Sequence, residues 1–353
     1  MNTTISGIRQ RVFGRTSDGG EVTCFTLDAG GDVTVEVLDY GAIVQSIRAL
    51  DRDGVAADVV LGYDAVADYE RDRFYLGAVV GRSAGRIAGA GFELDGRRVR
   101  LAANDGANHL HGGARGFGKV IWRARPFEDA TGVGVVLAHT SPDGDEGYPG
   151  TLDVRATYTL SAGDVLSVDY HAVTDRPTVV NLTQHSYFNL SGIGDVLAHE
   201  LEVRASAFTP LGEDLVPTGE IASVEGTPLD FRAPHRIGER IEADDAQLRI
   251  GAGYDHNFAL DGAAGTLRTA ARLADPVSGR VLEVATTEPG MQLYTGNYLD
   301  ATGKDGRRYG PRAGVCLETQ HYPDAPNQPG FPSTIVLPGE EYRSRTEFRF
   351  SVG

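Results

Sequence analysis

The pattern of apolar and polar positions predicts a chain built mainly from strands. Short runs rich in Val, Leu, Tyr and Thr alternate with clusters of Gly, Asp and Asn, as in strands joined by tight turns. Residues 92–99 are typical of a hairpin around the Asp95-Gly96 turn. The remaining predicted strands lie at residues 22–27, 33–38, 44–50, 58–61, 122–127, 134–139, 152–160, 165–173, 200–205, 254–260, 267–274, 281–286, 292–298, 315–319 and 342–352.

Helical signals are few. Asp64 is placed to N-cap a short helix at residues 65–71, and residues 237–248 are expected to include another. Strands without intervening amphipathic helices argue against a parallel α/β fold. We therefore expect an all-β fold, a large antiparallel β-sandwich with few short helices. No linker, fixed-period repeat or low-complexity segment divides the chain, which predicts a single domain over residues 1–353.

One stretch, residues 180–190, is polar where an ordinary strand would be apolar. If it is extended, its side chains alternate between two faces. Val180, Leu182 and Phe188 then share a face that is expected to join the core. The opposite face is a row of hydrogen-bonding side chains, which suits a polyhydroxylated ligand better than a structural strand; its members are Asn181, Thr183, His185, Tyr187 and Asn189.

Three further segments place ionisable residues in partly apolar surroundings. His111 lies in the glycine-rich loop at residues 104–113. In residues 253–258, alternation places Asp255 with Asn257 on one face and assigns His256 to the core.

Glu318 lies in the third segment, at residues 314–320, beside a cysteine and within an apolar strand. Burying a carboxylate there costs free energy unless a cation or hydrogen-bond donor pairs with it or it has a catalytic role. Glu318 is therefore the best candidate for a catalytic base. The structural alternatives are an arginine partner for Glu318 and a hydrogen bond from the His185 imidazole to the backbone.

Several motifs indicate a cofactor or metal only in part. Residues 113–119 have phosphate-loop spacing, but Val120 stands where Ser or Thr should hold magnesium. Residues 143–147 begin like a calcium loop, with glycine at a ligand position. His109 and His111 have no third ligand nearby in the sequence. No dinucleotide-binding fingerprint opens a βαβ unit, so neither a metal nor a nucleotide cofactor is expected.

Composition and charge narrow the classes of partner. The net charge of −16 over 353 residues disfavours nucleic acid and anionic membranes, and fits a neutral small molecule. Cys24 and Cys316 form neither a metal pair nor a disulfide framework, and we expect free thiols. With no signal-peptide core and no apolar run of membrane-spanning length, we expect a cytoplasmic protein, monomeric or homodimeric.

The candidate segments together resemble the aldose 1-epimerase (galactose mutarotase) family, from residues 12–14 to residues 348–352. The motifs that carry the resemblance lie at residues 108–113, 141–150, 181–190, 254–258, 290–297, 316–320 and 324–329. Each motif is weak alone, but their common order is specific. The sequence departs from the family pattern at Gly85 and Gln184, where relatives often carry Asn.

The resemblance implies a β-supersandwich that interconverts the α and β anomers of free hexoses such as galactose and glucose, without a cofactor. It implies Glu318 as the base that takes the anomeric hydroxyl proton, and His185 as the acid that protonates the ring oxygen. It also implies that His111, Arg86, Asp255 and Gln292 bind the sugar. The spacing alone leaves Arg82 open as the sugar contact in place of Arg86, whereas the family register favours Arg86.

Opening a hemiacetal requires one proton removed and one delivered, which a carboxylate and an imidazolium perform together. A histidine pKa near ~6.5 predicts this ion pair around neutral pH and a bell-shaped rate profile. The alternatives are a hexose-6-phosphate 1-epimerase, a non-catalytic carbohydrate-binding protein, and a glycosidase using Asp255 and Glu318. The phosphate alternative needs a basic pocket, and its only local cluster is Lys304 with Arg307 and Arg308.

Overall fold

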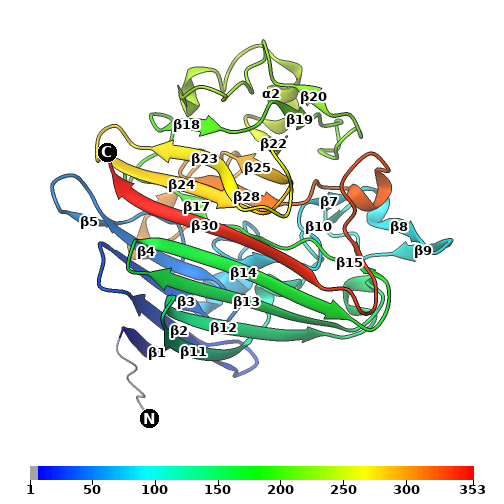
Figure 1. Cartoon of the computed structure of the whole chain (residues 1–353), viewed down its shortest axis with the longest axis horizontal. Coiled ribbons are helices and arrows are strands. Elements are labelled where there is room, and N and C mark those ends of the chain that lie inside the picture. Colours follow the sequence, from blue (N-terminus) through cyan, green and yellow to red (C-terminus); the bar gives the residue numbers. More distant parts are fainter. Residues whose placement is uncertain (1–6) are drawn as a thin grey trace.

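The computed structural model describes residues 7–353 and shows an all-β architecture of packed antiparallel sheets (Figure 1). The largest sheet has nine strands, in the order β11 (Arg123–Asp129), β12 (Gly132–Ser141), β13 (Leu152–Ser161), β14 (Val165–Thr174), β30 (Tyr342–Val352), β24 (Arg280–Thr286), β23 (Arg268–Ala274), β18 (Glu200–Val203) and β21 (His235–Arg236). Strand β30, drawn in red, pairs with β14 and β24 and so joins the C-terminal segment to the centre of this sheet.

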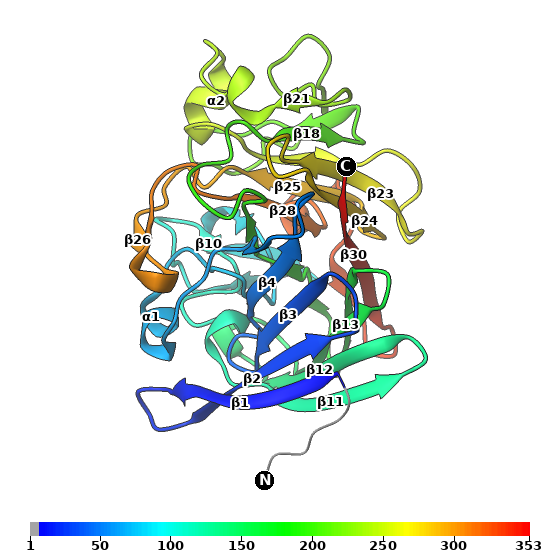
Figure 2. The same cartoon turned by 90° about the vertical axis from the view of Figure 1, so that its left-hand side faces the viewer.

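Two smaller sheets complete the main layers. One consists of β1 (Ile8–Arg15), β2 (Glu21–Asp28), β3 (Val33–Leu38), β4 (Val44–Leu50) and β5 (Ala56–Asp58). The other has the order β17 (Tyr187–Phe188), β28 (Val315–Gln320), β25 (Gly290–Tyr294), β22 (Asp255–Ala259), β19 (Ala207–Thr209) and β20 (Ala222–Ser223). In Figure 2 the five-stranded sheet lies at the bottom, β25 and β28 lie above it, and α2 lies at the far end.

Short elements connect these layers. The two-stranded pairs are β6 (Val79–Val80) with β16 (Thr183–Gln184), β7 (Arg86–Ile87) with β10 (His109–Leu110), β8 (Gly91–Leu94) with β9 (Arg97–Arg100), β15 (Thr178–Val179) with β29 (Ile335–Val336), and β26 (Ala301–Thr302) with β27 (Arg308–Tyr309). The helices are α1 (Val66–Arg71) and α2 (Ala246–Gly251), with 3₁₀ turns at Ala88–Ala90, Phe117–Lys119, Asp145–Gly147, Ile237–Glu239, Lys304–Gly306 and Ala325–Asn327. Each helix within residues 7–353 falls short of the length and apolar character needed to cross a membrane.

One apolar cluster joins the three main sheets. Val35 of β3, Val154 of β13 and Leu317 of β28 all belong to it and are almost fully buried. Strand β13 alternates buried and exposed positions, as expected for a strand with one solvated face. Strand β28 is buried at all six positions, because neighbouring layers cover both of its faces. Polar side chains on β28 are therefore shielded from bulk water.

The predicted all-β class, the Asp95-Gly96 hairpin and most of the predicted strands are confirmed. The strand expected at residues 58–61 was wrong, because β5 ends at Asp58, and the strand expected at residues 292–298 ends at Tyr294. Asp95 and Gly96 have φ of 50° and 71°, as a tight hairpin turn requires. The predicted helix cap was wrong: α1 follows Ala65, and the Asp64 carboxylate instead accepts the Asp305 backbone N–H at 2.7 Å. Helix α2 overlaps its predicted range and is capped by Asp245, which accepts two backbone N–H groups.

The prediction of one extended strand over residues 180–190 is also wrong. The chain contributes β16 and β17 to different sheets and turns between them. The Asn181 amide bridges to the backbone of His321, and the Asn189 amide donates to the Ala313 carbonyl at 2.9 Å. Much of the polar row therefore ties this irregular segment to its neighbours. Of its members, His185 and Tyr187 face the cavity described next.

Candidate active site

A cavity of about 470 Å³ opens between the six-stranded sheet and the loops beside it. All six residues singled out from the sequence line this cavity, although they come from segments far apart along the chain. They are Arg86, His111, His185, Asp255, Gln292 and Glu318.

Strand register places three of the polar side chains in one row. Asn257 of β22 is paired with Gln292 of β25, and Gln292 is paired with Glu318 of β28. Directly opposed residues on neighbouring antiparallel strands have close Cβ atoms on the same face of the sheet. Gln292 Nε2 donates to Asp255 Oδ1 at 2.7 Å and fixes that carboxylate. The predicted alternation of Asp255 and Asn257 toward one face is confirmed.

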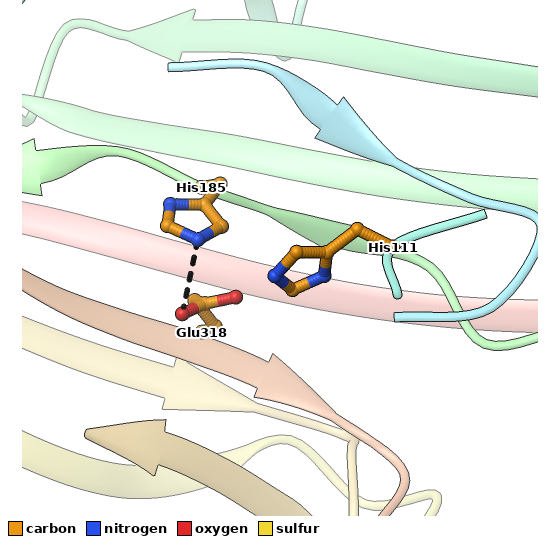
Figure 3. Close-up of side chains that lie close together, drawn as sticks. All are labelled: His111, His185 and Glu318. Carbon is orange, nitrogen blue, oxygen red and sulfur yellow. Dashed lines mark ion pairs between the residues drawn. The ribbon is translucent and has the colours of Figure 1, made fainter. Parts of the chain in front are cut away.

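His185 reaches the cavity from the turn between β16 and β17. Its backbone N–H donates to Ala78 and its carbonyl accepts from Gly77, both at 2.9 Å. The ring points toward Glu318, with His185 Nε2 3.5 Å from Glu318 Oε1 (Figure 3). Both side chains are less than 5% exposed. Glu318 Oε2 has no hydrogen-bond partner among residues 7–353, so the arginine partner considered from the sequence is not found in that range.

The chain is similar to known proteins over nearly its whole length. Residues 23–349 match the family model described as Aldose 1-epimerase. Galactose mutarotase from Bos taurus is 47% identical over 350 residues, which cover 98% of this chain and 99% of the bovine protein. Galactose mutarotase from Homo sapiens is 45% identical over 353 residues, 99% of this chain and 100% of the human protein. The chain belongs to the aldose 1-epimerase family.

The fold agrees with the same family. The crystal structure of galactose 1-epimerase from Lactobacillus acidophilus NCFM superposes with a TM-score of 0.87 at 31% identity, covering 98% of this chain and 99% of that one. The aldose 1-epimerase resemblance and the galactose mutarotase-like β-sandwich expected from the sequence are thus both confirmed.

Burial shifts the two facing groups of this aldose 1-epimerase family member in opposite directions. Desolvation raises the pKa of Glu318 well above its usual value, and the nearby Asp255 charge raises it further. Desolvation lowers the pKa of His185 to about 4. Together they favour a neutral carboxylic acid beside a neutral imidazole. The expectation of a histidine pKa near ~6.5 was therefore wrong, because model values apply to solvated side chains.

His111 has one tautomer imposed by its surroundings. The Gly85 backbone N–H donates to His111 Nδ1 at 3.2 Å, so the proton of the neutral ring resides on Nε2. Burial and the neighbouring His185 lower the pKa of His111 well below its usual value, which keeps the ring neutral. Its ring points toward Glu318 and His185 (Figure 3). His111 therefore offers a fixed N–H donor to the cavity.

The same tautomer weighs against a metal ion held by these side chains. One potential ligand atom from each of His111, His185 and Glu318 lies within 4.8 Å of the other two. A metal ligand must offer a lone pair, however, and Nε2 of His111 carries a proton while Gly85 occupies Nδ1. His109 lies elsewhere, hydrogen-bonded to the Ala102 carbonyl and the Tyr148 hydroxyl, both at 2.7 Å.

The two candidate arginines have different surroundings. Arg86 lines the cavity, and its Nε donates to Asp105 at 2.7 Å. Arg82 is 1% exposed and lies outside the lining, where it donates to the Ser141 hydroxyl and to backbone carbonyls at Ser141, Pro142 and Pro149. Arg82 is therefore a structural residue, which resolves the ambiguity left by the four-residue spacing. Of the two departures from the family pattern, Gly85 lines the cavity and Gln184 does not.

Sequence reasoning missed Tyr75. Its ring lies 4.7 Å from that of His111 and 6.0 Å from that of His185, centroid to centroid. Its φ of 59° is strained for a tyrosine, and the buried Asp72 carboxylate holds this turn by accepting the Phe74 and Leu76 N–H groups at 2.9 Å. The local sequence mixes charged residues at 70–73 with apolar residues at 74–76, an ordinary pattern that carries no signal for this position.

Strand alternation predicts Gln320 on the face of Glu318, but Gln320 was not named as a candidate site residue. It follows Glu318 by two residues on β28 and thus shares its face. The side-chain oxygens of Gln320 and Asn257 line the cavity region without hydrogen-bond partners in the described part of the chain. Strand periodicity was sufficient to predict both.

We expect the two arginines to separate stability from ligand binding. Arg82→Ala should lower the free energy of unfolding by about 3 kcal/mol or more, because it leaves several buried acceptors unpaired. Arg86→Ala, which breaks a partly exposed ion pair, should lower it by less than about 1 kcal/mol. Denaturant titration of both variants measures this; equal losses would contradict the assignment of Arg82 to the core.

The raised pKa of Glu318 also predicts a pH-dependent stability difference. Above its unfolded value of 4.5, the folded state binds this proton more tightly than the unfolded state, so stability falls as pH rises toward the folded value. Glu318→Gln removes that loss. Its free energy of unfolding relative to wild type should increase by about 1.4 kcal/mol per pH unit across this window. Denaturant titrations of both proteins at several pH values measure this difference. A difference that does not change with pH would contradict a buried, protonated Glu318.

Proposed function

We propose that the protein is an aldose 1-epimerase that interconverts the α and β anomers of free hexoses such as galactose and glucose. The observation that carries the proposal is the buried pair formed by His185 and Glu318, 3.5 Å apart in a cavity lined by hydrogen-bonding groups. The names of the bovine and human relatives, both galactose mutarotases, support galactose as a substrate.

In the proposed reaction, Glu318 is the base and His185 is the acid. Ring opening transfers the O1 proton to the Glu318 carboxylate while His185 delivers a proton to O5 and the C1–O5 bond breaks. Rotation about C1–C2 presents the other face of the aldehyde, and closure reverses both transfers. The ion pair needed at the start differs from the neutral pair only in the position of one proton. Sugar hydroxyls donating to Glu318 stabilise its ionised form.

The other lining groups hold the sugar in this proposal. His111 donates Nε2–H to a sugar oxygen, and Asp255, fixed by Gln292, accepts from a hydroxyl. Arg86 is held by Asp105 at the cavity wall and donates through its remaining N–H groups. These groups fix the reacting bond relative to the acid–base pair, which contributes to the rate independently of proton transfer.

Charge favours free hexoses over hexose 6-phosphates. Asp255 lines the cavity, where its negative charge would oppose a phosphate dianion. The basic cluster considered from the sequence lies outside the lining. There, Lys304 binds Asp58, Arg307 lies near Asp305 and Arg308 binds Asp300. A non-catalytic binding protein would gain nothing from a buried carboxyl oxygen left without a partner, at a cost of several kcal/mol once ionised.

The remaining expectations extend this proposal. The reaction needs no cofactor. A single domain is supported by the apolar cluster that joins the three main sheets. A cytoplasmic location is supported by the free, buried thiols of Cys24 and Cys316. Either a monomer or a homodimer is compatible with a cavity lined by one chain.

Polarimetry on freshly dissolved α-D-glucose and α-D-galactose tests the proposal directly. Wild type should accelerate the change in rotation, and Glu318→Gln should lower kcat by about 10²- to 10⁴-fold or more while sugar still binds. Glu128→Gln, at an exposed position, is the matched control and should keep full activity. Faster turnover of glucose 6-phosphate, or release of reducing sugar from a glycoside, would favour the corresponding alternative.

The pH dependence of kcat/KM should be bell-shaped, with a plateau set by one proton shared between His185 and Glu318. The acid limb should fall near pH 4, where His185 gains a second proton for the pair. The alkaline limb should lie well above the ordinary carboxylate range, because burial and Asp255 raise the Glu318 pKa. An acid limb near ~6.5 would show that His185 titrates as a solvated histidine.

A further inference from the structure

The second ring nitrogen of His185 contacts a thiol. Cys316 Sγ lies 3.5 Å from His185 Nδ1, and Cys316 is fully buried on β28. Cys316 precedes Glu318 by two residues, so the two side chains project from the same face of the strand. A single strand therefore supplies a partner to each nitrogen of the proposed acid, the thiol at Nδ1 and the carboxyl at Nε2.

The other aromatic neighbours of His185 leave Nδ1 to the thiol. Tyr75, His111 and Tyr187 pack against the ring at centroid distances of 6.0, 5.3 and 5.1 Å. Tyr187, the strand partner of Cys316, donates its hydroxyl to the Phe74 carbonyl at 2.9 Å. Glu318 faces Nε2, and the charge of Asp255 acts on Glu318. Among these ionisable neighbours, Cys316 is the one that contacts Nδ1.

His111 and His185 differ in the group that contacts Nδ1, and this difference shows what a thiol can do there. A backbone N–H at Nδ1 of His111 can only donate, so it fixes one tautomer and opposes protonation. A carboxylate at Nδ1 would only accept, so it would fix the proton on Nδ1 and favour the imidazolium. A thiol is both a weak donor and a weak acceptor. Burial and the charge of Glu318 raise the pKa of Cys316 well above its usual value, so the thiol keeps its proton.

We propose that Cys316 is a positioning residue that holds the His185 ring with Nε2 toward Glu318 and leaves its protonation state free to change. When Nδ1 is unprotonated, the thiol donates to it. When Nδ1 carries a proton, the sulfur accepts. The weak partner keeps His185 a strong enough acid to protonate O5. This inference rests on the proposed role of His185 and adds a residue that does not itself touch the sugar.

Two substitutions separate positioning from packing. Cys316→Ala keeps an apolar side chain and removes the hydrogen bond, whereas Cys316→Ser keeps a donor and acceptor in a less apolar side chain. If Cys316 positions the ring, Cys316→Ala should lower kcat about five- to tenfold with KM within twofold, the loss expected for one hydrogen bond, and Cys316→Ser should retain most activity. A packing role predicts the reverse order, because the serine hydroxyl is the poorer fit to an apolar site.

The acid limb of the pH profile gives a second readout. The serine oxygen accepts more strongly than sulfur, so Cys316→Ser should stabilise the imidazolium and move the limb upward. Cys316→Ala removes the acceptor and should move it downward. The matched control is Cys24, the other free cysteine, which is fully buried in the same apolar cluster as Cys316. Cys24→Ala and Cys24→Ser should leave the limb in place.

Imidazole ¹⁵N chemical shifts of the full chain test the contact without turnover, with His185→Asn used to assign the signal. Cys316→Ala should move the His185 Nδ1 signal, and Cys24→Ala should not. An unmoved signal, or activity in Cys316→Ala equal to or above that in Cys316→Ser, overturns the inference. A wild-type protein inactive on free hexoses would instead overturn the proposed function, and the shifts would still report on the thiol.

Discussion

The site depends on one constraint, a buried carboxyl group that has no cationic partner in the described part of the chain. Glu318 lies on a strand that is buried at every position, and its Oε2 has no hydrogen-bond partner within residues 7–353. Ionising it there costs several kcal/mol. The proton therefore stays on the group unless hydrogen-bond donors in the cavity stabilise the carboxylate as water would. A ligand rich in hydroxyl groups can do this, since each hydroxyl can donate to the carboxylate. Because Glu318 is buried in this way, it is expected to ionise when a hydroxyl-rich ligand is bound and to stay protonated when none is.

Strand register and backbone hydrogen bonds set the positions of the side chains around this carboxyl group. Register across β22, β25 and β28 sets Asn257, Gln292 and Glu318 in one row, and Gln292 fixes Asp255 beside it. The histidines come from turns, not from this sheet, and backbone hydrogen bonds at Gly77, Ala78 and Gly85 set their positions. The two carboxyl groups thus reside on the sheet and the two histidines on turns that backbone hydrogen bonds hold in place, an arrangement that is formed without a bound ligand.

Sequence periodicity predicted what depends on strand alternation. It placed Asp255 with Asn257 on one face and His256 in the core, and the motif order identified the six lining residues. It could not predict that residues 180–190 turn between sheets, because the asparagines that stabilise the turn bond to His321 and Ala313, far along the chain. Tyr75 was missed because its packing against His111 and His185 joins segments far apart in the chain. The pKa of His185 was misjudged because burial is a property of the packed sheets, and the sequence contains only the unperturbed side chain.

A shared proton also suits a neutral substrate. If the pair rested as an ion pair, the cavity would hold separated charges that a sugar must desolvate before it binds. As a neutral pair it presents hydrogen-bonding groups without that penalty, and charge develops only when hydroxyls are in place to stabilise it. The two histidines differ in the partner at Nδ1. The Gly85 backbone N–H fixes His111 as a donor through Nε2, whereas the Cys316 thiol, which can donate or accept, imposes no protonation state on His185. This scheme does not require a charged substrate, and an acidic chain can therefore bind and release a neutral sugar without long-range electrostatic attraction.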